Sequence, residues 1–271
     1  MKRDFDQPTG RRAVAEQKKY EAWETIFPYL EVLSGMESLS RHEDLVRDYL
    51  LKEAEKLGIE TRTDEVGNLW LLSDAPEGEI LLCAHMDKVG HAQEAVVEGT
   101  TVRGRLDDAL GTSIIMAALK KGHRPSVLFT VEEETGLYGS EFAVQAIMAG
   151  KSRKPKLVLI LDVSVVQQRG VGPLCYTSSG GGRPFPEAPI NAAKTILQRA
   201  GLRASFVPGH TNDSFSFRLL PEQGTLTLQI HVDNMHSRQE VADIADIKEA
   251  AKVLETILQH HEEIPNVEPA K

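Results

Sequence analysis

Three short apolar runs near the middle of the chain constrain its fold more than any other feature. Ile80–Ala84, Val127–Val131 and Leu157–Leu161 are almost continuously apolar, which is typical of strands buried on both faces. Residues with helical periodicity separate them, over about Leu110–Lys120 and about Ser140–Met148. This β-α-β-α-β order predicts an α/β fold in three layers, with a mainly parallel central sheet flanked by helices.

The flanking sequence extends this pattern at both ends. Before the first central strand it predicts two helices, the second with a cap-like serine at Ser40, and then a strand pair around a glycine turn. After the third strand it predicts a helix, one more strand and a last helix. These elements are expected at about Arg12–Val32, Ser40–Leu57, Glu60–Leu72, Ala188–Ala200, Thr225–Val232 and Ile247–His260.

No internal repeat or convincing linker divides the 271 residues, so one domain over residues 1–271 is the economical interpretation. Its first part, residues 1–35, is predicted to be a helical segment. The polar tail Glu263–Lys271 is predicted to be frayed, and Ser178–Gly182 is typical of a flexible loop.

Charge and targeting signals narrow the function classes. The formal net charge of -9 argues against a nucleic-acid partner, since such proteins usually carry a basic patch. The polar start Met1–Asp6 is no secretory signal, and no apolar stretch approaches the ~20 residues of a membrane span. The two cysteines, Cys83 and Cys175, are expected to be reduced. We therefore expect a cytoplasmic protein without a membrane partner.

Each central strand is followed by residue types that bind metal ions. In an open α/β sheet, ligands bind beyond the carboxyl ends of the strands, so these clusters are expected to converge. The clusters are His85-Met86-Asp87, Asp107-Asp108, Glu132-Glu133-Glu134, Asp162 and Asn234-Met235-His236-Ser237.

Each cluster alone has a structural explanation. A His-x-Asp is usually a hydrogen-bonded pair, and paired aspartates commonly cap a helix. A run of glutamates is normally solvated, and one aspartate after a strand forms a turn. Crowding so many carboxylates at one point, however, is costly unless cations neutralise them. One cation site explains all five clusters together, and we predict it at this edge of the sheet.

The same residues resemble the motifs of the co-catalytic zinc peptidases, the clan that contains the M42, M28 and M20 peptidases. The resemblance covers nearly the whole chain and is closest to M42 aminopeptidases. It implies a dinuclear metal-dependent hydrolase that cleaves amide bonds. The segments that carry it are Ala84–Gly90, Leu106–Asp108, Thr130–Leu137 and Met235–Glu240.

The resemblance also implies a set of metal ligands. His85 and Asp162 would bind one divalent ion, and Glu134 and His236 the other. Asp107 would bridge the two, and its peptide bond to the next residue would be cis. Because these ligands offer nitrogen and oxygen but no thiolate, zinc is the expected metal, and cobalt or manganese would also fit.

Two further residues receive roles in the same way. Glu133 would be the general base, taking a proton from a water acidified by the ions and returning it to the leaving amine. Asp87 would hold the ring of His85 in the right tautomer. The family pattern Glu-Glu-x-Gly selects Glu133 and Glu134 from the run of three glutamates, a choice that residue chemistry alone does not make.

The chain departs from the clan's larger members at two places. M42 enzymes insert a domain between the first histidine motif and the Asp-Asp motif, where this chain has only a short loop, about Gly90–Arg105. The span from Asp162 to His236 is too short for the lid domain of M20 enzymes. The layout is a bare catalytic domain, as in M28 enzymes. This puts a large self-compartmentalised assembly in doubt, while a monomer and a homo-oligomer formed through a different surface both stay open.

The sequence leaves open which class of substrate the site binds. An aminopeptidase acting on peptides needs an acidic group for the free α-ammonium. A deacylase or amidohydrolase of N-acyl amino acids needs a cation, and Arg183 after the glycine loop would serve. His210 is expected either to bind substrate or to stabilise its turn, and the role of the 178–183 loop is open. A third alternative is a non-catalytic, metal- or partner-binding member of the fold.

Overall fold

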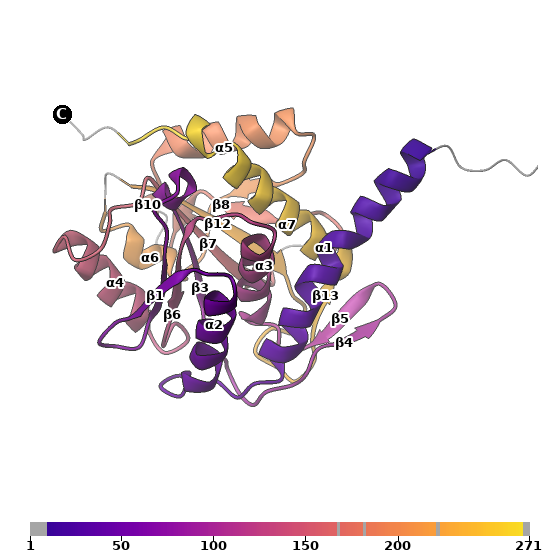
Figure 1. The fold of residues 1–271 in the computed structure, drawn as a ribbon, viewed down its shortest axis with the longest axis horizontal. Helices are drawn as coiled ribbons and strands as arrows, with labels where there is room; N and C mark the ends of the chain where they lie inside the picture. Colours follow the sequence, from indigo (N-terminus) through magenta and orange to yellow (C-terminus); the bar gives the residue numbers. More distant parts are fainter. Residues whose placement is uncertain (1–9, 167–168, 181–182, 221–222, 268–271) are drawn as a thin grey trace, which may run out of the picture.

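An eight-stranded mixed sheet forms the centre of the molecule (Figure 1). The computed structural model describes residues 10–166, 169–180, 183–220 and 223–267. In spatial order the strands are β1 (Glu60–Thr63), β2 (Leu69–Leu72), β6 (Ser126–Thr130), β3 (Ile80–His85), β7 (Leu157–Ser164), β12 (Gly224–His231), β8 (Leu174–Tyr176) and β11 (Ser205–Val207). The four central strands, β6, β3, β7 and β12, are parallel, so their carboxyl ends share one edge. The predicted mainly parallel α/β sheet is confirmed.

Helices cover both faces of this sheet (Figure 1). They are α1 (Gly10–Ser34), α2 (Asp44–Lys56), α3 (Ala109–Lys120), α4 (Tyr138–Met148), α5 (Glu187–Arg199), α6 (Ser214–Phe217) and α7 (Ile244–Gln259). A large apolar cluster packs α1, α2, α3, α5 and α7 against one face, and a smaller one packs α4 and α6 against the other. Neighbouring strand residues enter different clusters, Leu82 the first and Leu81 and Cys83 the second, which explains the continuous apolar runs.

The helix α3 carries the site's aspartates to the sheet. It packs between α1 and the central strands, and all its residues except Lys120 are buried. Such a helix must be apolar or small on every side, as its sequence is. Asp108 caps its start by accepting a hydrogen bond from the Gly111 N–H (2.9 Å), which fixes where the preceding Asp107 lies.

A second, three-stranded sheet lies beside the central one and consists of β4 (Val96–Glu98), β5 (Thr101–Gly104) and β13 (Glu240–Asp243). The expectation of a plain loop over Gly90–Arg105 was therefore wrong. The segment forms a hairpin because β5 finds a pairing partner in β13, which lies far away in the sequence. Val102, the central apolar residue of β5, is fully buried by this pairing.

Several local expectations need correction. Ser40 does not cap a helix: α2 begins later, and the Ser40 hydroxyl donates to Asp87 instead. Within the predicted flexible loop, Ser178–Ser179 forms a short strand, β9, which pairs with β10 (Arg183–Pro184). The tail is not frayed at its start, because Ile264 packs fully buried in the core.

The other predicted elements lie within a few residues of their expected positions, whereas the short elements β8, β11 and α6 were not predicted. Residues 1–9, 181–182 and 268–271 fall outside the described residues, so the domain boundaries 1–271 stay a prediction. Of the helices that the structure describes, none combines the length and apolar character that a bilayer crossing requires.

Candidate metal centre

All five predicted ligands come together at the carboxyl edge of the central strands. His85 ends β3, Asp162 lies near the end of β7, and Glu134 follows β6. Asp107 stands just before α3, and His236 lies in the loop between β12 and β13. The parallel order of the strands is what brings these segments to one point.

Asp107 lies between the two histidines and turns one carboxylate oxygen to each. Its Oδ1 is 3.2 Å from His85 Nε2, and its Oδ2 is 3.0 Å from His236 Nε2. The same His85 nitrogen is 3.8 Å from Asp162 Oδ1, and the His236 nitrogen is 3.2 Å from Glu134 Oε1. The peptide bond from Asp107 to the next residue is cis, as the resemblance implies.

Two buried oxygens at this centre are left without hydrogen-bond partners. Among the described residues, neither Asp107 Oδ1 nor Glu134 Oε1 accepts a hydrogen bond. Buried oxygens without donors are costly, and a cation is what would satisfy them. Possible ligand atoms of His85, Asp107 and Glu134 lie within 4.8 Å of one another, so the residues present fit a metal ion.

Asp108 is a neighbour that the sequence did not single out as a ligand. A carboxylate oxygen of Asp108 and possible ligand atoms of His85 and Asp162 also lie within 4.8 Å of one another. One oxygen, Oδ1, caps α3, and the buried Oδ2 has no hydrogen-bond partner in the described part of the chain. The aspartate pair therefore holds the helix and the centre in a fixed relation.

Burial and crowding change the pKa values of the site's ionisable groups. Burial raises the pKa of Glu133 to about 10 and that of Glu134 to about 7, and neighbouring aspartates add to both effects. A hydrogen bond with Asp107 raises the pKa of His236 to about 9. The centre therefore holds protons that a divalent cation would displace.

Asp87 organises the turn that carries the glutamates. Its buried carboxylate accepts the backbone N–H groups of Glu133 (3.0 Å) and Glu134 (3.2 Å) and the hydroxyl of Ser40 (2.6 Å). His85 Nδ1 lies 3.0 Å from the carbonyl oxygen of Asp87 and 3.5 Å from its carboxylate. Asp87 thus contacts the His85 ring mainly through its backbone, and its side chain aims the glutamate turn.

The three glutamates separate in space. Glu133 and Glu134 line the cavity at the centre. Glu132, which has a left-handed backbone (φ 52°), instead forms an ion pair with Arg41 at 2.9 Å. This is the register that the family pattern selects.

The cavity at the centre has a volume of about 310 Å³. His210 lines it, with its ring edge-on to Tyr176 at 6.1 Å between ring centres. Tyr176 also lines it and shares a hydrogen bond of 2.9 Å with Ser164. Sequence reasoning missed Tyr176, because it ends a strand of three residues that no pattern marks. The side chain of Arg183, considered above for carboxylate binding, lies outside the described residues.

Asn212 is a third residue whose role at the centre the sequence did not show. It is buried, and its Nδ2 donates to Asp162 Oδ2 at 3.0 Å. Its own Oδ1 accepts the N–H of Ser214. The segment that carries His210 is thereby tied to a predicted metal ligand. The only sequence signal was its place next to His210.

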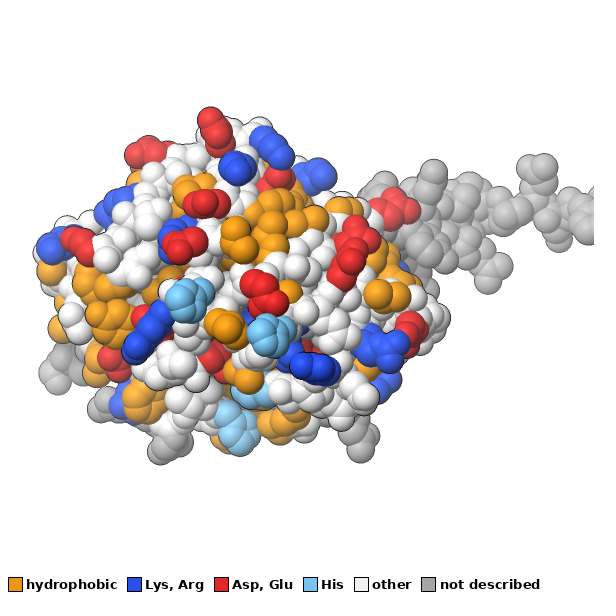
Figure 2. Space-filling view, turned by 90° about the horizontal axis from the view of Figure 1, so that it is seen from below, with side chains coloured by type: hydrophobic (Ala, Val, Ile, Leu, Met, Phe, Trp, Pro, Cys, Tyr) orange, Lys and Arg blue, Asp and Glu red, His pale blue; other side chains and the backbone are white. Residues whose placement is uncertain are grey.

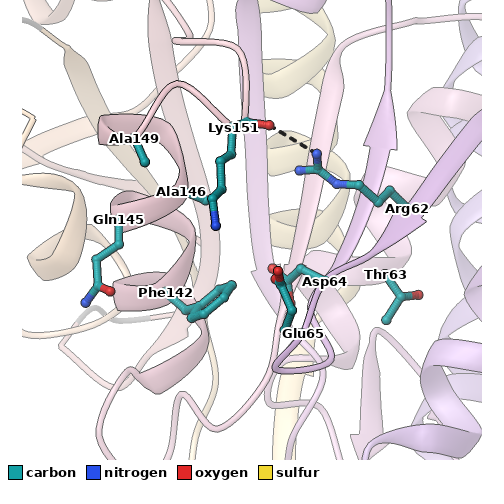
Figure 3. A pocket seen from close by; sticks show the side chains of 9 residues that line it. All are labelled: Arg62, Thr63, Asp64, Glu65, Phe142, Gln145, Ala146, Ala149 and Lys151. Atoms are coloured by element: carbon teal, nitrogen blue, oxygen red, sulfur yellow. Dashed lines mark hydrogen bonds between the residues drawn. The ribbon is translucent and has the colours of Figure 1, made fainter.

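A second cavity, of about 570 Å³, lies between β1 and α4 (Figure 3). Two of its charged side chains, Arg62 and Asp64, already serve the fold. Arg62 donates to the carbonyl oxygen of Lys151, and the Asp64 carboxylate accepts the side chains of Asn68 and Trp70. It contains none of the predicted site residues.

The face drawn in Figure 2 carries several histidine side chains near its middle. Acidic, basic and apolar side chains are mixed around them, and the coloured part of this face shows no extended patch of one sign.

Comparisons with known proteins identify a matching family and similar folds. The model of Peptidase family M28 matches residues 70–260. An aminopeptidase from the archaeon Desulfurococcus kamchatkensis has a similar structure, with a TM-score of 0.78 and 16% identity over 90% of this chain and 98% of that one. The aminopeptidase PepT of Bacillus cereus is also similar, with a TM-score of 0.72 and 14% identity over 89% of this chain and 98% of that one.

A third similar structure is the TET1 peptidase of Pyrococcus horikoshii, described as able to assemble into a tetrahedron or a large octahedral shell. Its TM-score is 0.70, with 17% identity over 86% of this chain and 99% of that one. At such identities these likenesses establish the fold.

Proposed function

The chain belongs to peptidase family M28, and from this premise we propose that it is a metal-dependent aminopeptidase that releases N-terminal residues from peptides. The resemblance to the co-catalytic zinc peptidases is confirmed at the level of the clan and the fold. The observation that carries the proposal is the position of Asp107 between two histidines, each beside a further carboxylate.

We assign the ligands as the sequence predicted. His85 and Asp162 would hold one divalent ion and Glu134 and His236 the other, with Asp107 contacting both. When bound, such ions acidify water and polarise the carbonyl group of an amide. Nitrogen and oxygen ligands without a thiolate favour zinc, and cobalt or manganese would also fit.

Glu133 is the proposed proton carrier. It lines the cavity beside the ligand Glu134, and its pKa is raised by burial. Bound cations would favour its ionised form, and this carboxylate would then accept a proton from water and return it to the leaving amine. Asp87 keeps this side chain in place, because it holds the backbone N–H of Glu133.

The lining of the cavity favours an aminopeptidase over a deacylase. Among its described residues there are four carboxylates, Asp107, Glu133, Glu134 and Asp162, but no lysine or arginine. All four are assigned to the ions or to proton transfer, so the discrimination rests on the missing cation: the carboxylate of an N-acyl amino acid finds no basic side chain among these residues. Val165 and Val166 at the rim suit an apolar residue of the substrate.

A paired assay tests the proposal. The metal-free protein is reconstituted in turn with zinc, cobalt and manganese and given aminoacyl substrates and their N-acyl counterparts, with a chelator control. We expect chelator-sensitive release of free N-terminal amino acids, fastest for apolar residues. Cleavage of only the N-acyl substrates would show that the protein is a deacylase that uses the same centre. Inactivity on both sets, with two ions bound, would favour the non-catalytic alternative.

The cytoplasmic location stays a prediction. Both cysteines are free and buried, which is compatible with a reducing compartment. Homo-oligomerisation is likewise proposed only, and light scattering on the purified protein would establish the number of subunits.

A further inference from the structure

Glu240 is a fully buried carboxylate on β13, between the segments that carry Asp107 and His236. Its Oε2 accepts the backbone N–H groups of Leu106 (2.5 Å) and Asp107 (3.3 Å). Its Oε1 accepts the backbone N–H of His236 (3.0 Å) and a guanidinium N–H of Arg105 (2.8 Å). One side chain thus contacts the backbone at two proposed ligands from distant parts of the sequence.

Arg105 makes this burial possible. It is itself only 3% exposed, and its charge compensates that of Glu240, which would be costly to bury alone. The same guanidinium group donates to the carbonyl oxygens of Ser237 (2.8 Å) and His91 (3.3 Å). The ion pair therefore joins three segments around the centre.

The segment of His236 needs such a tie more than the others do. His236 has a left-handed backbone (φ 63°), a conformation that is unfavourable for a residue with a side chain unless its surroundings enforce it. Its side chain is 41% exposed, whereas that of His85 is 3% exposed and ends a central strand. Burial, the strand and the contact with Asp87 fix His85, but little besides hydrogen bonds fixes His236.

We propose that Glu240 is a positioning residue of the metal centre. It holds the loop of His236 and the backbone of Asp107 in the arrangement that binds a cation. The ion held by Glu134 and His236 depends on this tie. The ion held by His85 and Asp162 depends on it much less. The inference rests on the proposed function in one respect, that the centre binds two divalent ions.

The test compares three variants of the full-length protein. Glu240→Ala removes the tie, and Glu240→Gln keeps the shape and one acceptor oxygen. Asp246→Asn is the matched control. Asp246 is also buried and also accepts two backbone N–H groups, from Gly170 (2.7 Å) and Gly172 (3.1 Å), but it does not line the cavity.

Each variant is titrated with zinc and with cobalt against a competing chelator, and the thermal midpoint of the metal-free form is measured. For Glu240→Ala we expect one of two ions to bind about 10–100-fold more weakly while the other changes little, the range known for residues that orient metal ligands. Glu240→Gln is expected to recover part of this loss. Asp246→Asn is expected to lower stability but keep both affinities.

Wild-type affinity for both ions in the two Glu240 variants would overturn the inference. The inference would also be overturned if Glu240→Ala weakened the binding of both ions equally and Asp246→Asn, at the same loss of stability, did the same. If Glu240→Ala does not fold, Glu240→Gln decides by the same criteria. A wild-type protein that binds fewer than two ions would instead overturn the proposed function.

Discussion

Replacing Glu133 with glutamine separates the chemistry of this side chain from its shape. Glutamine fills the same volume but cannot take up a proton, and the backbone hydrogen bond from residue 133 to Asp87 is unaffected. Loss of a general base typically costs 10²–10⁴-fold in rate, or about 3–5 kcal/mol of barrier. We expect a fall of that size in kcat, with both metal ions still bound because Glu133 is not a proposed ligand.

The same substitution should stabilise the metal-free protein. The pKa of Glu133 is raised from an ordinary 4.5 to about 10 in the folded state. Between these values the unfolded chain ionises while the folded protein keeps its proton, so each pH unit above 4.5 costs about 1.4 kcal/mol. At pH 7 the penalty amounts to about 3 kcal/mol, and glutamine does not incur it.

The assay has two parts, steady-state turnover of the reconstituted enzyme and denaturant unfolding of the metal-free protein between pH 5 and 8. The stability gain of Glu133→Gln should be small near pH 5 and should grow as pH rises. The reasoning is refuted if turnover falls less than tenfold. It is equally refuted if the stability difference from wild type is the same at every pH.

The pKa of His236 is about 9 in the metal-free protein, so zinc must displace a proton from this side chain in order to bind. Zinc affinity should therefore rise from pH 7 to pH 9, and calorimetry in buffers of different ionisation heat should detect the released proton. An affinity that does not change with pH would contradict this. Asn212→Ala removes the donor to Asp162 and should weaken metal binding about 10–100-fold in a chelator competition, whereas unchanged affinity would exclude a positioning role. Phe129→Ala empties a fully buried position on β6 and should cost about 3–5 kcal/mol in urea unfolding; a loss below about 1 kcal/mol would show that the core closes over the gap.

That the proposed ligands converge could be predicted from the sequence, because their convergence follows from two simple rules. Continuous apolar runs identify the central strands, and parallel strands bring their carboxyl ends to one edge. His85 and Asp162 stand at the ends of such runs, so their approach could be predicted from chain order alone. The choice between Glu132 and Glu133 could not, because nothing in the run itself shows which side chain turns outward to Arg41.

What the sequence missed depends on pairings between distant segments. Residues such as Val96 and Val97 on β4 are exposed, so β4 and β5 carry little apolar signal until β13 pairs with them. Ser40 has the right chemistry for a helix cap, but it serves Asp87, 47 residues away. The contact of Asn212 with Asp162 spans 50 residues and likewise leaves no trace in local periodicity.

The hairpin of β4 and β5 also offers a place to lengthen the chain. Gly99 at its tip has a positive φ (66°) and open space around it, and the paired residues Glu98 and Thr101 keep the two ends close. The contact with Glu240 lies at the opposite end of the hairpin, near Gly104. Because exposed tips of this kind tolerate insertions, an affinity peptide or a surface anchor placed at Gly99 would immobilise the protein without touching any of the proposed metal ligands.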